Sequence, residues 1–384
     1  MSGTTVHGMV ADGFEAVRQA YAAVLAEQGG QVGSQLAVHM RGRLVVDLWA
    51  GEDTGGDTLT GVYSSTKGAA TLVVALLVQD GILKLDERVA AHWPEFGAAG
   101  KEMITLRDVL THRSGVIGVD GGLPPADLAD DAVIARRLAG QRPYWRPGSA
   151  YGYGGFVSFA IVGEVIRRVT GQSLQQVYDE RIRTAYGLDL FLGLPEAEER
   201  RFRPIEWWTA TPEQEAAFWA NLPGPDSILG IAYGLNGRPP LDQVAFANNR
   251  VVRANGQASA GGVGNARGLS GLYAAAVWGI DGQPPLLDPE TVAEFAQLHS
   301  VGADLVRGDQ GNYAIGFQAK GLRYPLLSAN AFGHDGSAGS EAFADPVTGL
   351  AFGYTRRRFG FAWSYPEHDH LVRAVHQAVT DAAG

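Results

Sequence analysis

Segments with the residue pattern of β-strands lie at both ends of this chain, and a long, mostly helical and loop-rich stretch separates them. Near the N-terminus, SQLAVHM, a turn at Arg41-Gly42 and RLVVDLWAG predict a β-hairpin. Strand-like segments return in the last quarter, in YAIGFQAKG, AFGHDGSAGSEAFAD and LAFGYTRRR. We therefore predict one α/β lobe built from residues 1–90 and 291–384, with a mainly helical lobe, residues 91–290, inserted between its two parts.

The composition excludes several classes of function. Of 384 residues, 46% are hydrophobic and 19% are charged, which is typical of a globular protein. The net charge of −10 argues against a nucleic-acid partner. No cysteine is present, so disulfides, thiolate zinc sites and cysteine nucleophiles are excluded. We expect no cofactor and no metal.

The start of the chain and its hydrophobic segments bear on its location. The first residues, MSGTTVHGMVADG, lack the basic residues and apolar run of a signal peptide. No segment reaches about 18 uninterrupted apolar residues, so no membrane span is expected. A cytoplasmic location is the default prediction.

The tetrapeptide Ser64-Ser65-Thr66-Lys67 stands where an extended segment turns into a long apolar helix. Residues three apart face the same side of a first helical turn, so the Lys67 amine can take the proton of the Ser64 hydroxyl. The helix N-terminus also offers main-chain N–H groups to an oxyanion. Taken alone, the pattern favours a helix-capping serine and a surface lysine.

Two further motifs follow in order, Tyr153-Gly154-Gly155 within RPGSAYGYGGF and His334-Asp335-Gly336 within FGHDGSAGS. With ITLRDVLTHRSGV around them, the chain resembles the serine β-lactamase-like superfamily from about Gly33 to its end. The branch that it resembles includes class C β-lactamases, family VIII carboxylesterases and serine transacylases. The resemblance implies an antiparallel β-sheet flanked by helices with an inserted helical lobe, as in β-lactamases and penicillin-binding proteins, and an active site between the lobes.

The resemblance also assigns roles to residues. Ser64 would form the acyl-enzyme, and Lys67 and Tyr153 would jointly carry its proton. The main-chain N–H groups of Ser64 and Ser337 would form the oxyanion hole. His334 would line the pocket and order its strand. A register with Tyr151 in place of Tyr153 remains the alternative. The predicted substrate-binding residues are His334, Asp335, Gly336, Ser337 and Gly155.

The motifs depart from the family pattern at two positions. Gly155 stands where the family usually has an asparagine that contacts β-lactam side chains, which favours an esterase or a transacylase over a β-lactamase. Asp335 stands where a small or neutral residue is common. A carboxylate there would disfavour anionic substrates and suit an amine-bearing one.

Other segments allow a functional and a structural interpretation. We expect His112 and the run Gly261–Gly268 to be structural, the latter as a turn before a helix without a clear preceding strand. Residues 356–358, three arginines, fit solvated charges better than an anion site. Residues 367–370 fit a helix start better than a metal site. Ser259 is placed at the edge of the cleft. The aromatic residues that either wall an acyl pocket or belong to the core are Trp207, Trp208, Phe218 and Trp219.

The leading hypothesis is ester hydrolysis of a small-molecule acyl substrate through an acyl-enzyme on Ser64. The second is a tailoring transacylase that passes the acyl group to an amine or alcohol acceptor. The third is an amide hydrolase of the β-lactamase or D-aminopeptidase type. A non-catalytic binding protein of the same fold is the hypothesis from a different class. The sequence leaves the acyl group, the acceptor and the oligomeric state open.

Overall fold

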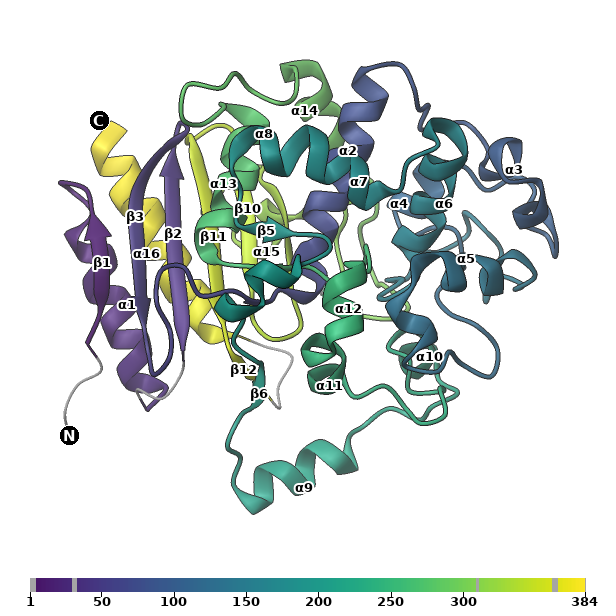
Figure 1. Cartoon of the computed structure of the whole chain (residues 1–384), viewed down its shortest axis with the longest axis horizontal. Helices are drawn as coiled ribbons and strands as arrows, with labels where there is room; N and C mark the ends of the chain where they lie inside the picture. The colour runs from purple at the N-terminus through teal and green to yellow at the C-terminus, as the bar shows by residue number, and fades with distance from the viewer. Residues whose placement is uncertain (1–4, 30–32, 309–310, 361–364, 384) are drawn as a thin grey trace.

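The computed structural model describes residues 5–29, 33–308, 311–360 and 365–383 (Figure 1). A seven-stranded antiparallel sheet is its centre, with strand order β1-β3-β2-β11-β10-β9-β8. The predicted antiparallel sheet flanked by helices is therefore confirmed. The strands are β1 (His7–Val10), β2 (Ser34–Met40), β3 (Arg43–Ala50), β8 (Gln318–Ala319), β9 (Phe332–Asp335), β10 (Glu341–Asp345) and β11 (Leu350–Arg356).

Pairing between β2 and β11 joins the two ends of the chain in one sheet, with Leu36 opposite Tyr354. The hairpin of β2 and β3 has the predicted turn, and Arg41 and Gly42 both have positive φ angles there. The segment YAIGFQAKG forms much less strand than predicted. Gly316 has φ +73°, which interrupts an extended backbone, and α15 (Lys320–Arg323) begins directly after β8.

Helices cover both faces of this sheet. On one face, α1 (Glu15–Glu27) and α16 (Pro366–Ala383) pack on large apolar side chains of the central strands, such as Val38 and Phe352. On the other face lies α13 (Ala266–Val277), which approaches the sheet very closely at Gly353. A Cβ atom there would lie 2.3 Å from the carbonyl oxygen of Ala266, so only glycine fits.

The long apolar helix predicted after Ser64 is α2 (Thr66–Gln79), and every residue from Thr66 to Leu77 is buried. It begins two residues later than the motif, because Tyr63–Ser65 form a short 3₁₀ turn before it. A helix that is apolar on all sides must be covered on all sides. This burial gives Lys67 no exposed surface.

The middle of the chain contains mostly helices and also short strands. The boundaries of the two lobes themselves stay a prediction. The remaining helices are α3 (Val89–His92), α4 (Leu106–Leu110), α5 (Asp131–Ala139), α6 (Ser158–Thr170), α7 (Leu174–Tyr178), α8 (Thr184–Tyr186), α9 (Pro212–Ala220), α10 (Ile228–Ala232), α11 (Gln243–Asn248), α12 (Arg250–Asn255) and α14 (Pro289–Ala296). The remaining strands are β4 (Thr60–Gly61), β5 (Leu190–Phe191), β6 (Glu206–Trp207), β7 (Val263–Gly264) and β12 (Arg358–Phe359).

Two expectations about loops and charges need correction. The turn before α13 does follow a strand, the short β7, and the Asn265 side chain caps the helix by accepting the N–H of Gly268. Arg356 is not solvated, because it is buried in an ion pair with Glu367 at the start of α16. Within the described residues, no helix is long and apolar enough to cross a membrane.

Candidate active site

The turn that carries Ser64 is held by contacts from three segments. Tyr63 has φ +46°, an unusual value for a non-glycine residue, and it directs the chain from β4 into the 3₁₀ turn. The Thr66 hydroxyl donates to the Tyr63 carbonyl oxygen and accepts the N–H of Gly262 at 2.9 Å. Ser340 donates to the Val62 carbonyl oxygen at 2.8 Å. The nucleophile candidate therefore sits on a fixed, strained turn.

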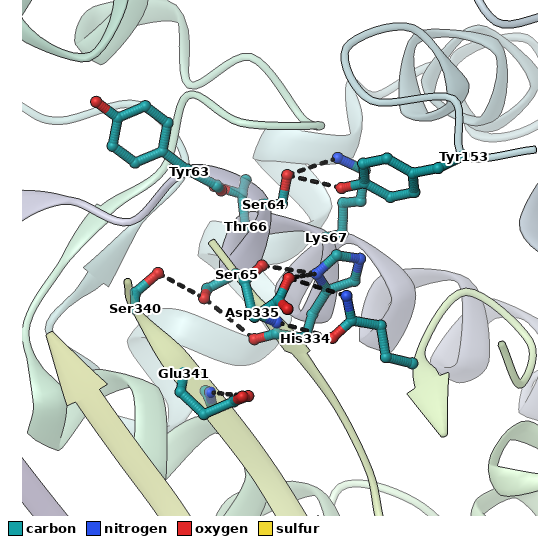
Figure 2. A network of polar contacts seen from close by, with 12 residues as sticks. Tyr63, Ser64, Ser65, Thr66, Lys67, Tyr153, His334, Asp335, Ser340 and Glu341 are labelled. Carbon is teal, nitrogen blue, oxygen red and sulfur yellow. Dashed lines mark hydrogen bonds and ion pairs between the residues drawn. The ribbon is translucent and has the colours of Figure 1, made fainter. Parts of the chain in front are cut away.

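The structure brings Ser64, Lys67 and Tyr153 together (Figure 2). The Ser64 Oγ lies 3.2 Å from Lys67 Nζ and 2.7 Å from the Tyr153 hydroxyl, which donates to it. Tyr151, the alternative, points elsewhere and donates to the carbonyl oxygens of Gly302 and Gly311. The geometry thus favours the register with Tyr153.

Lys67 is enclosed by main-chain carbonyl groups. Its Nζ lies 2.6 Å from the Gly155 carbonyl oxygen and 2.7 Å from that of Ser259. Burial holds the pKa of Lys67 well below its ordinary value, so the neutral amine is favoured. Ser259, expected at the cleft edge, is itself fully buried and reaches Lys67 through its carbonyl oxygen.

Tyr153 is packed by other rings. It stacks on Tyr313 with ring centroids 6.0 Å apart and meets His112 edge-on at 5.0 Å. Burial raises the pKa of Tyr153 well above its usual range, so its hydroxyl keeps its proton and can donate. Burial also lowers the pKa of His112 to about 3, and its neutral Nδ1 accepts the N–H of Gly154. His112 therefore orients the tyrosine motif, in line with the structural interpretation.

His334 lies behind the site rather than on an open pocket wall, because it is completely buried. Its Nδ1 lies 2.8 Å from the Asp335 carbonyl oxygen, and burial holds the pKa of the ring well below its ordinary value. Its carbonyl oxygen accepts the Ser65 hydroxyl at 3.1 Å. His334 thus orders β9 against the nucleophile turn, which was the second part of the expectation, but it does not line the pocket.

Gly336 and Ser337 follow β9 where the sheet edge meets the nucleophile turn. A Cβ atom on Gly336 would lie 2.3 Å from the Val62 carbonyl oxygen, so a larger residue would push the two segments apart. Ser337 is half-buried, and its carbonyl oxygen accepts the Tyr365 hydroxyl. The structure therefore brings the third motif to Ser64 at close range.

Asp335 does not present a free negative charge. Its Oδ1 accepts the Gln318 side-chain amide at 2.9 Å and lies 3.6 Å from the Arg307 guanidinium. Burial alone would raise the pKa of Asp335, but Arg307, Lys320 and His334 outweigh it, and the pKa lies well below its usual range. Because the carboxylate is compensated, the argument for an amine-bearing substrate loses its basis.

Arg307 is the site residue that sequence reasoning missed. Its guanidinium lies 5.5 Å from the centroid of the Tyr153 ring. Asp304 holds the two segments together, because its Oδ1 accepts the N–H groups of Tyr153, Val306 and Arg307. The segment LVRGDQG carries no motif, so only the three-dimensional structure reveals this neighbour. In the described part of the chain, no group of three acidic, histidine or cysteine side chains could hold a metal ion.

Comparison with known proteins gives the family. The family model described as Beta-lactamase matches residues 16–377, almost the whole chain. The chain belongs to this beta-lactamase family. Among curated members, the Esterase/beta-lactamase LipL of Mycobacterium tuberculosis is 28% identical over 362 residues, covering 90% of this chain and 81% of LipL. The family resemblance inferred from the three motifs is therefore confirmed.

Solved structures in the family align with the entire fold. EstA from Arthrobacter nitroguajacolicus Rue61a is 39% identical, with a TM-score of 0.89 over 98% of this chain and 99% of EstA. A family VIII carboxylesterase is 32% identical, with a TM-score of 0.84 over 97% and 100% of the two chains. A penicillin-binding protein homologue from Caulobacter crescentus is 31% identical, with a TM-score of 0.83 over 98% and 100%. The chain is thus an enzyme of the esterase and β-lactamase type of serine hydrolase.

Proposed function

We propose that the protein hydrolyses carboxylic esters through an acyl-enzyme on Ser64. The observation that carries the proposal is the placement of the Ser64 Oγ between a buried amine at 3.2 Å and a phenol at 2.7 Å. LipL is named an esterase/beta-lactamase, and one similar structure is a carboxylesterase, which supports ester bonds as the target. Release of p-nitrophenol from p-nitrophenyl acetate by the wild type, and its loss in Ser64→Ala, tests the proposal.

The hydrogen bonds of Lys67 match a neutral amine that accepts a proton. A neutral amine has two N–H bonds, and the carbonyl oxygens of Gly155 and Ser259 take both of them. Its lone pair then faces the Ser64 hydroxyl. As the Ser64 Oγ bonds to the acyl carbon, its proton passes to Lys67 Nζ.

The negative charge that forms on the carbonyl oxygen needs donors. We assign them to the main-chain N–H groups of Ser64 and Ser337, at the start of the nucleophile turn and just after β9. Collapse of the tetrahedral intermediate breaks the bond to the leaving oxygen. Tyr153 gives that oxygen its proton and recovers one from Lys67. Water then repeats the sequence in place of the alcohol, releasing the acid and restoring both side chains.

Hydrolysis is preferred over acyl transfer for a specific reason. The transacylase hypothesis relied partly on Asp335 as an anchor for an amine, and that carboxylate is compensated by Arg307. A non-catalytic binding role would not require a buried lysine directed at a serine and a tyrosine. Gly155 argues against a β-lactamase, because it leaves no side-chain amide for a β-lactam substituent, and it does not distinguish an esterase from a transacylase.

Gly155 yields a first prediction. A Cβ atom there would lie 2.8 Å from the Ala232 carbonyl oxygen, and Gly155 itself carries a carbonyl oxygen that positions Lys67. We expect Gly155→Asn to lower kcat/KM for p-nitrophenyl acetate by about ten- to a hundredfold, since a small displacement of a catalytic group is costly. Gly163→Ala, at a glycine with no neighbour closer than 4.0 Å, is the control and should keep activity. Equal activity of the two variants would contradict the prediction.

Arg307 yields a second prediction, on pH dependence. Its positive charge disfavours a charged Lys67 and favours a Tyr153 anion, so it lowers the pKa of both groups, against the larger effect of burial on Tyr153. In Arg307→Gln the charge is lost and Asp335 is less fully compensated, and both changes raise the pKa of Lys67. Because neutral Lys67 is the active form, the acidic limb of kcat/KM should move to higher pH by about one unit.

The control for this prediction is Arg307→Lys, which keeps the charge and should restore much of the wild-type profile. The measurement is kcat/KM for p-nitrophenyl acetate against pH for the three proteins. A uniform loss of activity without any movement of the acidic limb would mean that Arg307 only supports the loop.

A further inference from the structure

A cavity of about 290 Å³ lies beside the third motif, between the segment from α9 to α11 and strand β12. We call it the aromatic pocket. Its lining includes Ser337 and, from segments distant in sequence, several aromatic side chains. The aromatic residues that define it are Trp207, Phe218, Trp219, Tyr233, Phe359 and Tyr365. Trp207, Phe218 and Trp219 belong to the aromatic cluster that the sequence allowed either in a pocket wall or in the core.

The aromatic pocket adjoins the nucleophile mainly beside Tyr63 and Ser337, and one wall residue, Tyr233, also lies 6.4 Å from the Tyr153 ring, centroid to centroid. Tyr63, directly before Ser64, packs edge-on against Phe359 at 5.7 Å and donates its hydroxyl to the carbonyl oxygen of Gln243, another lining residue. Figure 2 shows Tyr63 and Tyr153 on opposite sides of Ser64. In the proposed mechanism the leaving oxygen takes its proton from Tyr153, so the alcohol half lies on that side. The acyl half is then directed toward the pocket.

The chemistry of the walls limits what the aromatic pocket can hold. Among the described lining residues, Asp242 alone is charged, and its Oδ1 already accepts the N–H groups of Val244 and Ala245 as the cap of α11. A carboxylate would lose its hydration there without gaining a positively charged partner among the described lining residues. The volume is at the lower end of the roughly 300–1,000 Å³ range of small-molecule pockets, which fits one aromatic ring or a chain of several carbons.

Helix α9 forms the outer wall and has no buried residue. Figure 1 shows it standing away from the body of the molecule. Trp219 is 57% exposed, and its ring lies 5.2 Å from that of Phe218. An apolar acyl group in the pocket would bury apolar surface of both rings and of the acyl group itself, which favours binding.

We infer that the aromatic pocket binds the acyl half of the ester and selects uncharged aryl or medium-length alkyl acyl groups. This inference rests on the proposed ester hydrolysis. Each additional buried methylene should raise kcat/KM about three- to fourfold until the pocket is full. An acyl chain that ends in a carboxylate should be rejected.

The test compares p-nitrophenyl acetate, butyrate, hexanoate, benzoate and monosuccinate as substrates of the wild type and two wall variants. We expect hexanoate and benzoate to exceed acetate by about tenfold or more, and monosuccinate to fall well below butyrate. Trp219→Ala should reduce the ratio of hexanoate to acetate at least about threefold. Leu222→Trp places a bulkier side chain at a lining position that is 38% exposed. It should lower kcat/KM for the hexanoate ester and leave kcat/KM for the acetate ester unchanged. Met103→Ala, at an exposed residue outside the lining, is the control.

The outcomes separate this inference from the proposed function. If the wild type hydrolyses none of the esters, the proposed function fails. If it hydrolyses acetate but acyl length, charge and the wall variants make no difference, the inference about the pocket is overturned. A second series of acetate esters with alcohols of increasing length completes the test. Wall variants that change selectivity only in that series would place the alcohol half in the pocket and would also overturn the inference.

Discussion

Replacing Ser64 by alanine is expected to lower kcat/KM for p-nitrophenyl acetate by about 10⁴-fold or more. Lys67 and Tyr153 both contact the Ser64 Oγ. Its removal leaves no nucleophile that the amine could deprotonate. The main-chain N–H groups stay in place, but a donor pair alone binds the substrate without forming an acyl-enzyme. The loss should appear in kcat, measured with purified protein at saturating ester.

The adjacent Ser65 provides a matched control. Its hydroxyl is completely buried and contacts the His334 carbonyl oxygen and the Ser340 hydroxyl instead of the reacting centre. Ser65→Ala should therefore lower the unfolding temperature and reduce kcat/KM by no more than about tenfold. If Ser65→Ala were as inactive as Ser64→Ala while remaining folded, the assignment of the nucleophile would be wrong.

Replacing Lys67 by methionine is expected to lower kcat/KM by about 10³-fold. Methionine can occupy the same buried space, but it removes the group that takes the Ser64 proton. It also leaves the carbonyl oxygens of Gly155 and Ser259 without this donor, which should cost about 1–3 kcal/mol of stability each. Kinetics and thermal unfolding measured on the same sample separate the chemical loss from the structural one.

Lys101 is the control for Lys67, because it is a second fully buried lysine that lies away from the site. Its Nζ donates to the carbonyl oxygens of Ala98, Ala139 and Gln141. Lys101→Met should therefore destabilise the protein to a similar extent and leave kcat/KM for the folded enzyme nearly unchanged. If the two lysine variants lose activity in proportion to stability alone, Lys67 has no catalytic role.

The parts of the fold that the sequence predicts are those with local signals. The hairpin of β2 and β3, the buried helix α2 and the closing helix α16 follow from periodicity and turn residues within each segment. The pairing of β2 with β11 spans more than 300 residues and has no local signal. The strand-like segments at both ends of the chain predicted one shared lobe, but nothing in the sequence indicated which strands pair.

The candidate site divides in the same way. Ser64, Lys67 and Tyr153 belong to motifs and could be selected from the sequence, and the geometry brings them into contact. The partner of Asp335 could not be predicted, because Arg307 comes from a loop without a pattern. A charge seen in sequence, such as that of Asp335, says little about substrates until its neighbours are known.

The aromatic cluster shows a different limit. Aromatic residues close in sequence are compatible with a core and with a pocket wall, since both bury rings. Trp219 is 57% exposed, so it does not belong to the core. It lines the cavity beside Ser337, which supports its place in a pocket wall. Helix propensity and periodicity carry no information on which side of a helix faces a cavity rather than its neighbours.

The most direct test of the acyl-enzyme is intact-mass spectrometry of acid-quenched reactions with p-nitrophenyl hexanoate. The account predicts that the wild type gains the mass of one hexanoyl group within the first turnovers, that peptide mapping places it on Ser64, and that it disappears as the ester is exhausted. Ser64→Ala should gain no such mass. Turnover of the ester without any adduct, or an equal adduct on Ser64→Ala, would contradict the central claim.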